Sequence, residues 1–230
     1  MAQNNTKITG LGWKLTGVLL LIYSFYQGFM GKVPTLDILN ESIRNLYFHV
    51  PMWFGMTALL AVSMFFAIRY LVTNNAAFDN KSNAFASVGM LMGILGILTG
   101  SVWAKNTWGT FWTNDAKLNG AAISLLIYSA YFILRSSFED EQNRARISAV
   151  YNIFAFAILI PLLFILPRMV SSLHPGNGGN AGFNAYDLDN NMRIVFYPAV
   201  IAWIIIGTWV STLVYRTKTV EKFLNEEQNV

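Results

Sequence analysis

One segment of the chain combines large aromatic rings with a carboxylate in a pattern that suggests a binding surface. It reads NTWGTFWTND at residues 106–115 and lies between two strongly apolar stretches. On a helix, Trp108, Phe111, Trp112 and Asp115 would share one face, because their spacings of three, one and three residues follow the helical period. Such a face would lie along the outer surface of a membrane.

The tryptophans of this region are open to two interpretations. Tryptophan favours the membrane–water interface in any membrane protein, so these residues are consistent with an interfacial belt. Their density favours a ligand site instead, since Trp103, Trp108 and Trp112 lie within ten residues and the whole chain has seven tryptophans. A rigid group of rings is a suitable seat for a flat apolar ligand.

The chain has only two histidines, His49 and His174. A histidine in a membrane bundle often makes only a structural hydrogen bond, but an ionisable group is costly to bury there and therefore indicates function. Two imidazoles that flank an aromatic surface are able to bind haem iron from opposite sides. A bare transition metal would usually need more histidine or carboxylate ligands nearby.

Several other chemistries are excluded. The absence of cysteine excludes disulfides, thiolate metal sites, iron–sulfur clusters and covalent haem attachment through CxxCH. The segment GFMGKV at 28–33 only superficially resembles a phosphate loop, because Tyr26 replaces the first glycine and Val33 replaces the Ser or Thr. No predicted span carries a buried carboxylate, which argues against a proton-coupled transporter.

The composition is that of a membrane protein: 54% of residues are hydrophobic and 12% are charged, against about 25% charged in soluble domains. A helix crosses the bilayer core with roughly 17 to 25 residues. We therefore predict an all-α integral membrane protein, a six-transmembrane-helix bundle with an outward-facing tryptophan-rich loop between the third and fourth helices. A single domain (1–230) would contain spans at about 14–31, 46–70, 83–104, 118–136, 147–168 and 193–215, followed by a cytoplasmic tail at 216–230.

The distribution of Lys and Arg predicts the orientation of this bundle. Six of these residues fall in the connections at 32–44, 105–117 and 168–193, and the other ten lie on the side of the termini. Both termini should thus be cytoplasmic, and the three connections should face outward together with both histidines. The outward cations that are candidates to pair with the carboxylates of a ligand are Arg44, Lys105, Lys117, Arg168 and Arg193.

A row of glycines marks the third predicted span. Its members are spaced by four, three and four residues, so they share one face: Gly89, Gly93, Gly96 and Gly100. Small residues in such a row allow two helices to approach closely. We interpret the row as a helix-packing surface.

The motif and its flanks resemble a known family. GSVWAKNTWGTFWTNDAKLNG at 100–120, FHVP at 48–51 and SSLHP at 171–175 are similar to haem exporter protein C of bacterial cytochrome c maturation, within the tryptophan-rich haem-handling superfamily. The resemblance extends through essentially all six spans. It implies a protein that holds haem at the outer face of the inner membrane and delivers it to a periplasmic haem chaperone, as a transport component rather than an enzyme.

The resemblance also implies a cofactor, partners and roles for particular residues. The cofactor would be non-covalent haem b with His49 and His174 as axial ligands, and the partners an ABC ATPase, a second permease-like subunit and a small membrane peptide. Trp108, Gly109, Trp112 and Asp115 would belong to the motif that seats haem, and Trp103 and Phe111 complete the aromatic group. Two departures from the family pattern concern the contacts with haem: Asn114 stands directly before the Asp, and Lys117 replaces an Arg.

Three other functions stay open at this point. A subunit of a cytochrome c haem lyase would share the motif, but such proteins are larger and have additional spans and histidines. A structural or small-solute membrane subunit would have interfacial aromatics and incidental histidines. An electron-transferring b-type cytochrome would place its haem ligands deeper in the membrane, which fits poorly with His174 in the Gly-rich HPGNGGNAG segment.

Overall fold

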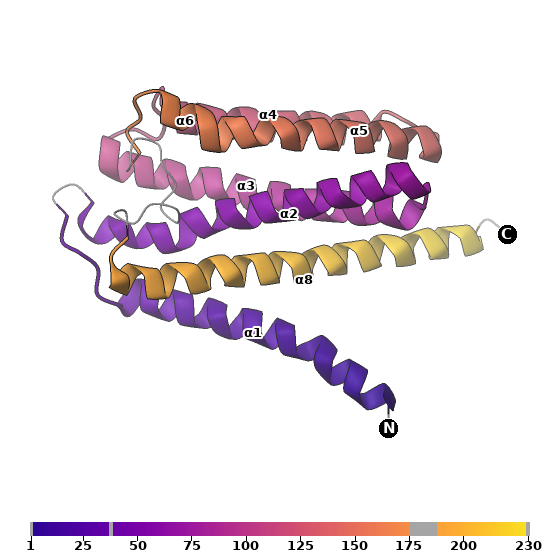
Figure 1. The fold of residues 1–230 in the computed structure, drawn as a ribbon, viewed down its shortest axis with the longest axis horizontal. Helices are drawn as coiled ribbons and strands as arrows, with labels where there is room; N and C mark the ends of the chain where they lie inside the picture. Colours follow the sequence, from indigo (N-terminus) through magenta and orange to yellow (C-terminus); the bar gives the residue numbers. More distant parts are fainter. Residues whose placement is uncertain (1, 37–38, 175–187, 229–230) are drawn as a thin grey trace.

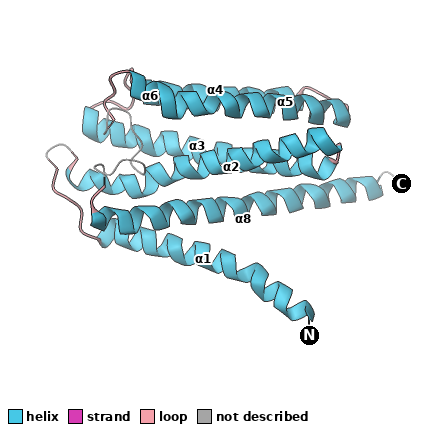
Figure 2. Ribbon diagram, viewed as in Figure 1, coloured by secondary structure: helices cyan, strands magenta, loops and turns pink. Residues whose placement is uncertain are grey.

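The protein is a bundle of long helices. In the computed structural model, residues 2–36, 39–174 and 188–228 are described, and these residues form helices and connections without any strand (Figures 1 and 2). The helices, in chain order, are α1 (Ala2–Met30), the 3₁₀ turn η1 (Asn40–Asn45), α2 (Leu46–Thr73), α3 (Ala76–Trp108), α4 (Ala116–Ser136), α5 (Glu141–Ile160), the π-helical turn η2 (Pro161–Ile165), α6 (Leu166–Met169) and α8 (Asn190–Gln228). The all-α prediction is confirmed.

The helices lie in three approximate layers (Figure 1). One layer holds α4 beside the continuous run of α5, η2 and α6, the middle layer holds α2 and α3, and the last holds α8 and α1. Both termini lie at one end of the bundle with the α2–α3 and α4–α5 connections. The connections that follow α1 and α3 lie at the opposite end, together with the end of α6 and the start of α8, and we call this the distal end.

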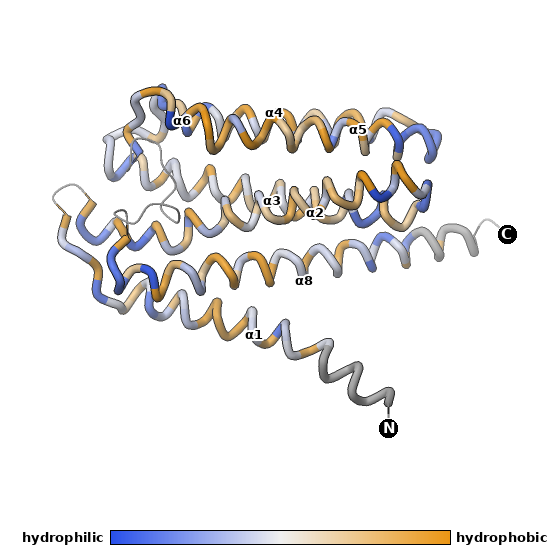
Figure 3. Tube along the Cα trace, viewed as in Figure 1, coloured by the Kyte–Doolittle hydropathy of each residue, from blue (hydrophilic) through white to orange (hydrophobic). Residues whose placement is uncertain are grey.

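Five helical stretches are long and apolar enough to cross a membrane. They are Asn40–Thr73, Ala76–Trp108, Ala116–Ser136, Glu141–Met169 and Asn190–Glu221. Hydrophilic residues concentrate toward the ends of these helices (Figure 3). The first predicted span, 14–31, is helical through Met30 as part of α1, but α1 is not among the five stretches found in the described residues. The other five predicted spans fall within them.

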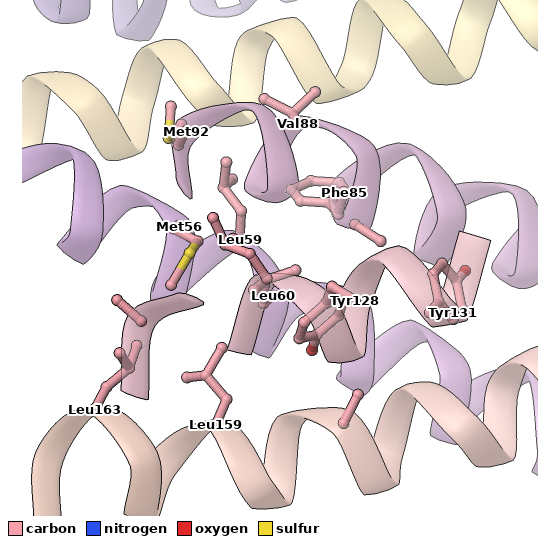
Figure 4. Close-up of a cluster of buried hydrophobic side chains, with 14 residues drawn as sticks. Met56, Leu59, Leu60, Phe85, Val88, Met92, Tyr128, Tyr131, Leu159 and Leu163 are labelled. Atoms are coloured by element: carbon pink, nitrogen blue, oxygen red, sulfur yellow. The ribbon is translucent and has the colours of Figure 1, made fainter. Parts of the chain in front are cut away.

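The main core lies where α2, α3, α4 and α5 meet. Figure 4 shows Met56, Leu59 and Leu60 of α2 directed at side chains from the neighbouring helices, which include Phe85 of α3 and Tyr128 of α4. A β-carbon added at any member of the glycine row would come within 3.0 Å of a side chain of α2. The row therefore allows α2 and α3 to pack closely, as the sequence predicts.

The helical interpretation of residues 108–115 is wrong. Helix α3 ends at Trp108 because Gly109 adopts a left-handed conformation (φ 78°), which terminates a helix at little steric cost for glycine. Residues 109–115 are not helical, and α4 begins only after Asp115. Phe111, Trp112 and Asp115 thus do not continue the face of α3 that carries Trp108.

The helices also extend beyond their predicted ends at the terminal side of the bundle. Because α3 begins at Ala76, before the predicted start of that span at residue 83, Asp79 lies in its first turn and is buried beside Arg135 of α4. The carboxylate and the guanidinium form two parallel hydrogen bonds of 2.7 and 2.6 Å. The expectation of no buried carboxylate is therefore wrong here, although this carboxylate is paired.

Candidate functional site

A cavity of about 400 Å³ lies at the distal end and contains both histidines of the chain in its wall. Its volume is within the roughly 300 to 1,000 Å³ typical of ligand pockets. The wall is mostly apolar and is built by η1, α2, α3, α4, η2 and the segment after α6. Of the residues that the sequence proposes for the site, the cavity brings together His49, His174, Trp103, Trp108 and Trp112.

His49 lies in the first turns of α2 and is enclosed by aromatic rings. The ring of Trp53, one helical turn later, is 6.3 Å from the imidazole between centroids, and that of Trp103 on α3 is 5.9 Å away, both edge-on. The Nδ1 atom of His49 lies 3.1 Å from Oγ1 of Thr99 on α3. The indole nitrogen of Trp103 donates to Ser42, which fixes the position of the ring.

Gly100 provides the space for this imidazole. A β-carbon at Gly100 would lie 2.6 Å from Cε1 of His49 and 3.3 Å from both ring nitrogens. The last glycine of the packing row therefore has a second effect: it places the His49 ring against the backbone of α3. The π-helical turn η2 contributes Leu163 and Phe164 to the cavity wall.

His174 follows the end of α6 and is held by Asp115. Its Nδ1 atom is 3.0 Å from Oδ1 of Asp115, and the ring of Trp108 lies edge-on to it at 5.1 Å between centroids. Burial lowers the pKa of His174 to about 4, and the nearby charge of Lys117 acts in the same direction, while Asp115 opposes both. The imidazole is therefore neutral at physiological pH and able to act as a metal ligand.

Asp115 joins two parts of the site. It caps α4 by accepting from the backbone N–H groups of Lys117 (2.9 Å) and Leu118 (3.3 Å). Its other oxygen accepts from the Ser172 hydroxyl (2.7 Å) and the Leu173 N–H (2.8 Å). Burial by itself raises the pKa of Asp115, but these hydrogen bonds and His174 outweigh it and hold the pKa below its usual value. Asp115 is thus an ionised anchor for the His174 segment.

The tryptophan-rich loop presents its rings in different directions. Trp112 lines the cavity although its side chain is 41% exposed. Phe111 is 59% exposed and lies outside the cavity lining, and the amino group of Lys105 lies over its ring, 5.7 Å from the centroid. Gly109 is also outside the lining, where its carbonyl accepts from Lys105. The loop therefore has an inward ring and an outward ring.

One of the five candidate cations faces the cavity. Among the described residues, Lys117 is the only Lys or Arg in the cavity wall. Arg44 instead binds Glu41 and the backbone carbonyls of Gly28 and Gly31 at the end of α1. Lys117, one of the two positions that the sequence analysis singles out as departures, thus supplies positive charge to the cavity.

Sequence reasoning missed three contributors to the site. Trp53 had a usable signal, because a residue four positions after His49 on a helix lies on the same face. Thr99 had none, since its contact with His49 joins segments far apart in the chain. Ser172 lies within the SSLHP segment, but its contact with Asp115 also depends on the fold. Most of HPGNGGNAG, at 175–182, lies outside the described residues.

The arrangement is chemically suited to a flat, largely apolar ligand with a metal centre. The Nδ1 atoms of both imidazoles already have partners, so coordination of a metal would use Nε2 of each ring. The indole rings supply apolar surface, and Lys117 supplies a partner for an anionic group. Two imidazole donors in one cavity wall suit an iron whose remaining ligands come from a macrocycle.

Comparison with known proteins matches this chain to one family. The family model described as Heme exporter protein C matches residues 4–229. Heme exporter protein C of Escherichia coli (strain K12) is 27% identical over 166 residues, which cover 71% of this chain and 66% of that protein, just under two thirds of its length. The same protein of Rhodobacter capsulatus is 24% identical over 210 residues, 88% of this chain and 82% of that one.

A mitochondrial relative is also similar to part of the chain. The putative cytochrome c biosynthesis ccmC-like mitochondrial protein of Marchantia polymorpha is 34% identical over 90 residues, 39% of each chain. The family model is the broader match, since it runs through every helix from α1 to α8. The protein therefore belongs to the haem exporter protein C family.

Proposed function

We propose that this protein binds haem non-covalently at the periplasmic face of the bacterial inner membrane and delivers it to a periplasmic haem chaperone. The observation that carries the proposal is that the chain's two histidines, distant in sequence, line one mostly apolar cavity at the distal end. His49 and His174 would hold the iron, while Trp103, Trp108 and Trp112 would cover the macrocycle. The family name and that of the Marchantia relative support a role in haem handling for cytochrome c maturation.

In this function the protein's residues bind, orient and release haem without covalent chemistry. Lys117 would pair with a propionate, and Trp112, which is both in the cavity and exposed, would lie where haem leaves. Release requires that an imidazole give up the iron. The sequence has no phosphate loop, so energy would come from an ABC ATPase acting with a second permease-like subunit and a small membrane peptide.

The direct test is transfer between purified proteins. Haem-loaded protein in detergent is mixed with a periplasmic haem chaperone, the two are separated, and haem is measured on each by absorption. We expect haem to move to the chaperone, while added apocytochrome without the chaperone should acquire no covalent haem. Covalent attachment to apocytochrome under these conditions would favour the haem lyase, and the absence of bound haem would favour a structural subunit.

Phe111 is expected to serve transfer rather than retention, since its ring is exposed and lies outside the cavity. Truncating an aromatic anchor of an interface typically costs 1 to 2 kcal/mol or more, so Phe111→Ala should slow transfer to the chaperone by about 5-fold or more with bound haem unchanged. Phe65→Ala is the control, because Phe65 is also exposed (53%) but lies in the second half of α2. Equal transfer by both variants would contradict this role.

Gly100→Ala is expected to weaken haem retention because the new methyl group would displace the His49 ring. Only a side chain needs to shift, so the fold should persist. Retention after gel filtration in detergent is expected to fall about 10-fold or more, the effect typical of disturbing a ligand's support. Gly12→Ala on α1 is the matched control, since a β-carbon there meets no atom within 4 Å. Unchanged retention in Gly100→Ala would show that the position of His49 does not matter.

A further inference from the structure

The two histidines of the cavity have chemically different partners. Nδ1 of His174 faces the carboxylate of Asp115 at 3.0 Å, whereas Nδ1 of His49 faces the hydroxyl of Thr99 at 3.1 Å. A ligating histidine whose second nitrogen donates to a carboxylate is a stronger donor to metal than one whose partner is neutral, because the negative charge increases the basicity of the ring.

The hydrogen bonds define which ring nitrogen carries the proton in each case. The single hydroxyl proton of Thr99 is directed to the backbone carbonyls of Leu95 (2.8 Å) and Gly96 (3.1 Å) of its own helix. Its oxygen is then left to accept from Nδ1–H of His49. The carboxylate of Asp115 only accepts, so His174 is also protonated at Nδ1. Both rings therefore offer an unprotonated Nε2, and the difference between them lies in the partner.

The carboxylate is also held firmly enough to keep this role. Asp115 is 3% exposed and accepts from the backbone of α4 on one side and from Ser172 and Leu173 on the other. These bonds tie the segment that carries His174 to the start of α4. His174 is therefore held in place by these bonds, although it follows the end of a helix and His49 lies within one.

We propose that the two axial ligands are unequal: His174, supported by Asp115, stays on the iron, and His49, supported by Thr99, is the ligand that leaves first. Asp115 and Thr99 are positioning residues that act through the histidines. The inference rests on the proposed function, because it requires that both imidazoles hold haem. It assigns an order to release: His49 would leave the iron first, while the haem would stay attached through His174.

Carbon monoxide tests the order directly, since it replaces one axial ligand of ferrous haem and its vibrations report the donor strength of the ligand that remains. The protein is reconstituted with haem in detergent, reduced and exposed to CO, and the Fe–CO and C–O bands are recorded by resonance Raman and infrared spectroscopy. The wild-type adduct is expected to match that of His49→Ala and to differ from that of His174→Ala. Asp115→Asn should shift the wild-type bands toward those of a weaker donor, and Thr99→Val should leave them in place.

The controls separate this inference from the proposed function. Asparagine caps helices about as well as aspartate, so Asp115→Asn preserves the start of α4 while removing the charge. Three wild-type results would overturn the inequality. The adduct could match that of His174→Ala, it could show both sets of bands, or it could fail to form under conditions in which both single variants bind CO. Bands that are unchanged in Asp115→Asn would overturn it as well. Wild-type protein without a bis-imidazole spectrum before CO is added would instead overturn the proposed function.

Discussion

Replacing both His49 and His174 by alanine is expected to reduce haem retention by more than about 100-fold, and each single replacement by at least about 10-fold. Disturbing the support of a metal ligand alone costs roughly 10- to 100-fold, so the loss of a ligand should cost at least as much. The cavity has these two imidazoles as its only histidines, because the chain contains no others. Haem per protein after gel filtration in detergent measures the effect.

Free imidazole provides the control for the alanine variants. Each substitution leaves a space the size of the missing ring, so millimolar imidazole should restore haem binding in either single variant if coordination is what was lost. Circular dichroism should show unchanged helix content, because neither imidazole lies in the buried hydrophobic clusters. Haem retention equal to wild type in the double variant would remove both histidines from the site.

Arg135→Ala or Asp79→Ala is expected to destabilise the protein by about 3 to 5 kcal/mol, the cost of leaving one partner of a buried ion pair alone. The pair is about 10% exposed on each side chain and is bidentate, with bonds of 2.7 and 2.6 Å between α3 and α4. A thermal unfolding curve in detergent, followed by circular dichroism, should show the midpoint fall steeply.

A second ion pair in the same chain provides the comparison. Arg144 and Glu141 lie 3.6 Å apart with exposures of 32% and 62%, so Arg144→Ala should change the stability by no more than about 1 kcal/mol. Replacing both Asp79 and Arg135 with apolar residues of similar size should cost less than either single replacement, because no unpaired charge remains. Equal effects of Arg135→Ala and Arg144→Ala would mean that the buried pair does not contribute as inferred.

The sequence predicts the helices of this fold well, because a long uncharged run in a membrane has few alternatives to a helix. The interior of each predicted span is helical, and the errors lie at the ends. Helix α3 extends back to Ala76, and α8 continues to Gln228 through the segment predicted as a tail, since polar residues end an apolar run without ending a helix. Helix α3 ends at Gly109 through its left-handed backbone conformation, and α4 begins after Asp115, whose side chain caps it.

The site is less predictable, because its contacts join segments that composition and periodicity do not relate. The number of histidines and the density of tryptophans point to His49, His174 and Trp108, and the cavity does bring these together. The role of Asp115 differs from the one implied by a shared helical face: it caps α4 and holds His174. The contact of Thr99 with His49 depends on the register of α2 against α3, which a single sequence does not give.

The central claim is that one iron is held by two imidazoles, one from α2 and one from the segment after α6. It is tested most directly by electron paramagnetic resonance of the ferric haem complex in detergent, comparing wild type with His49→Ala and His174→Ala. The account predicts a low-spin spectrum with two nitrogen axial ligands in the wild type, replaced by a high-spin spectrum in each variant. A wild-type spectrum that persists unchanged in either variant would contradict it.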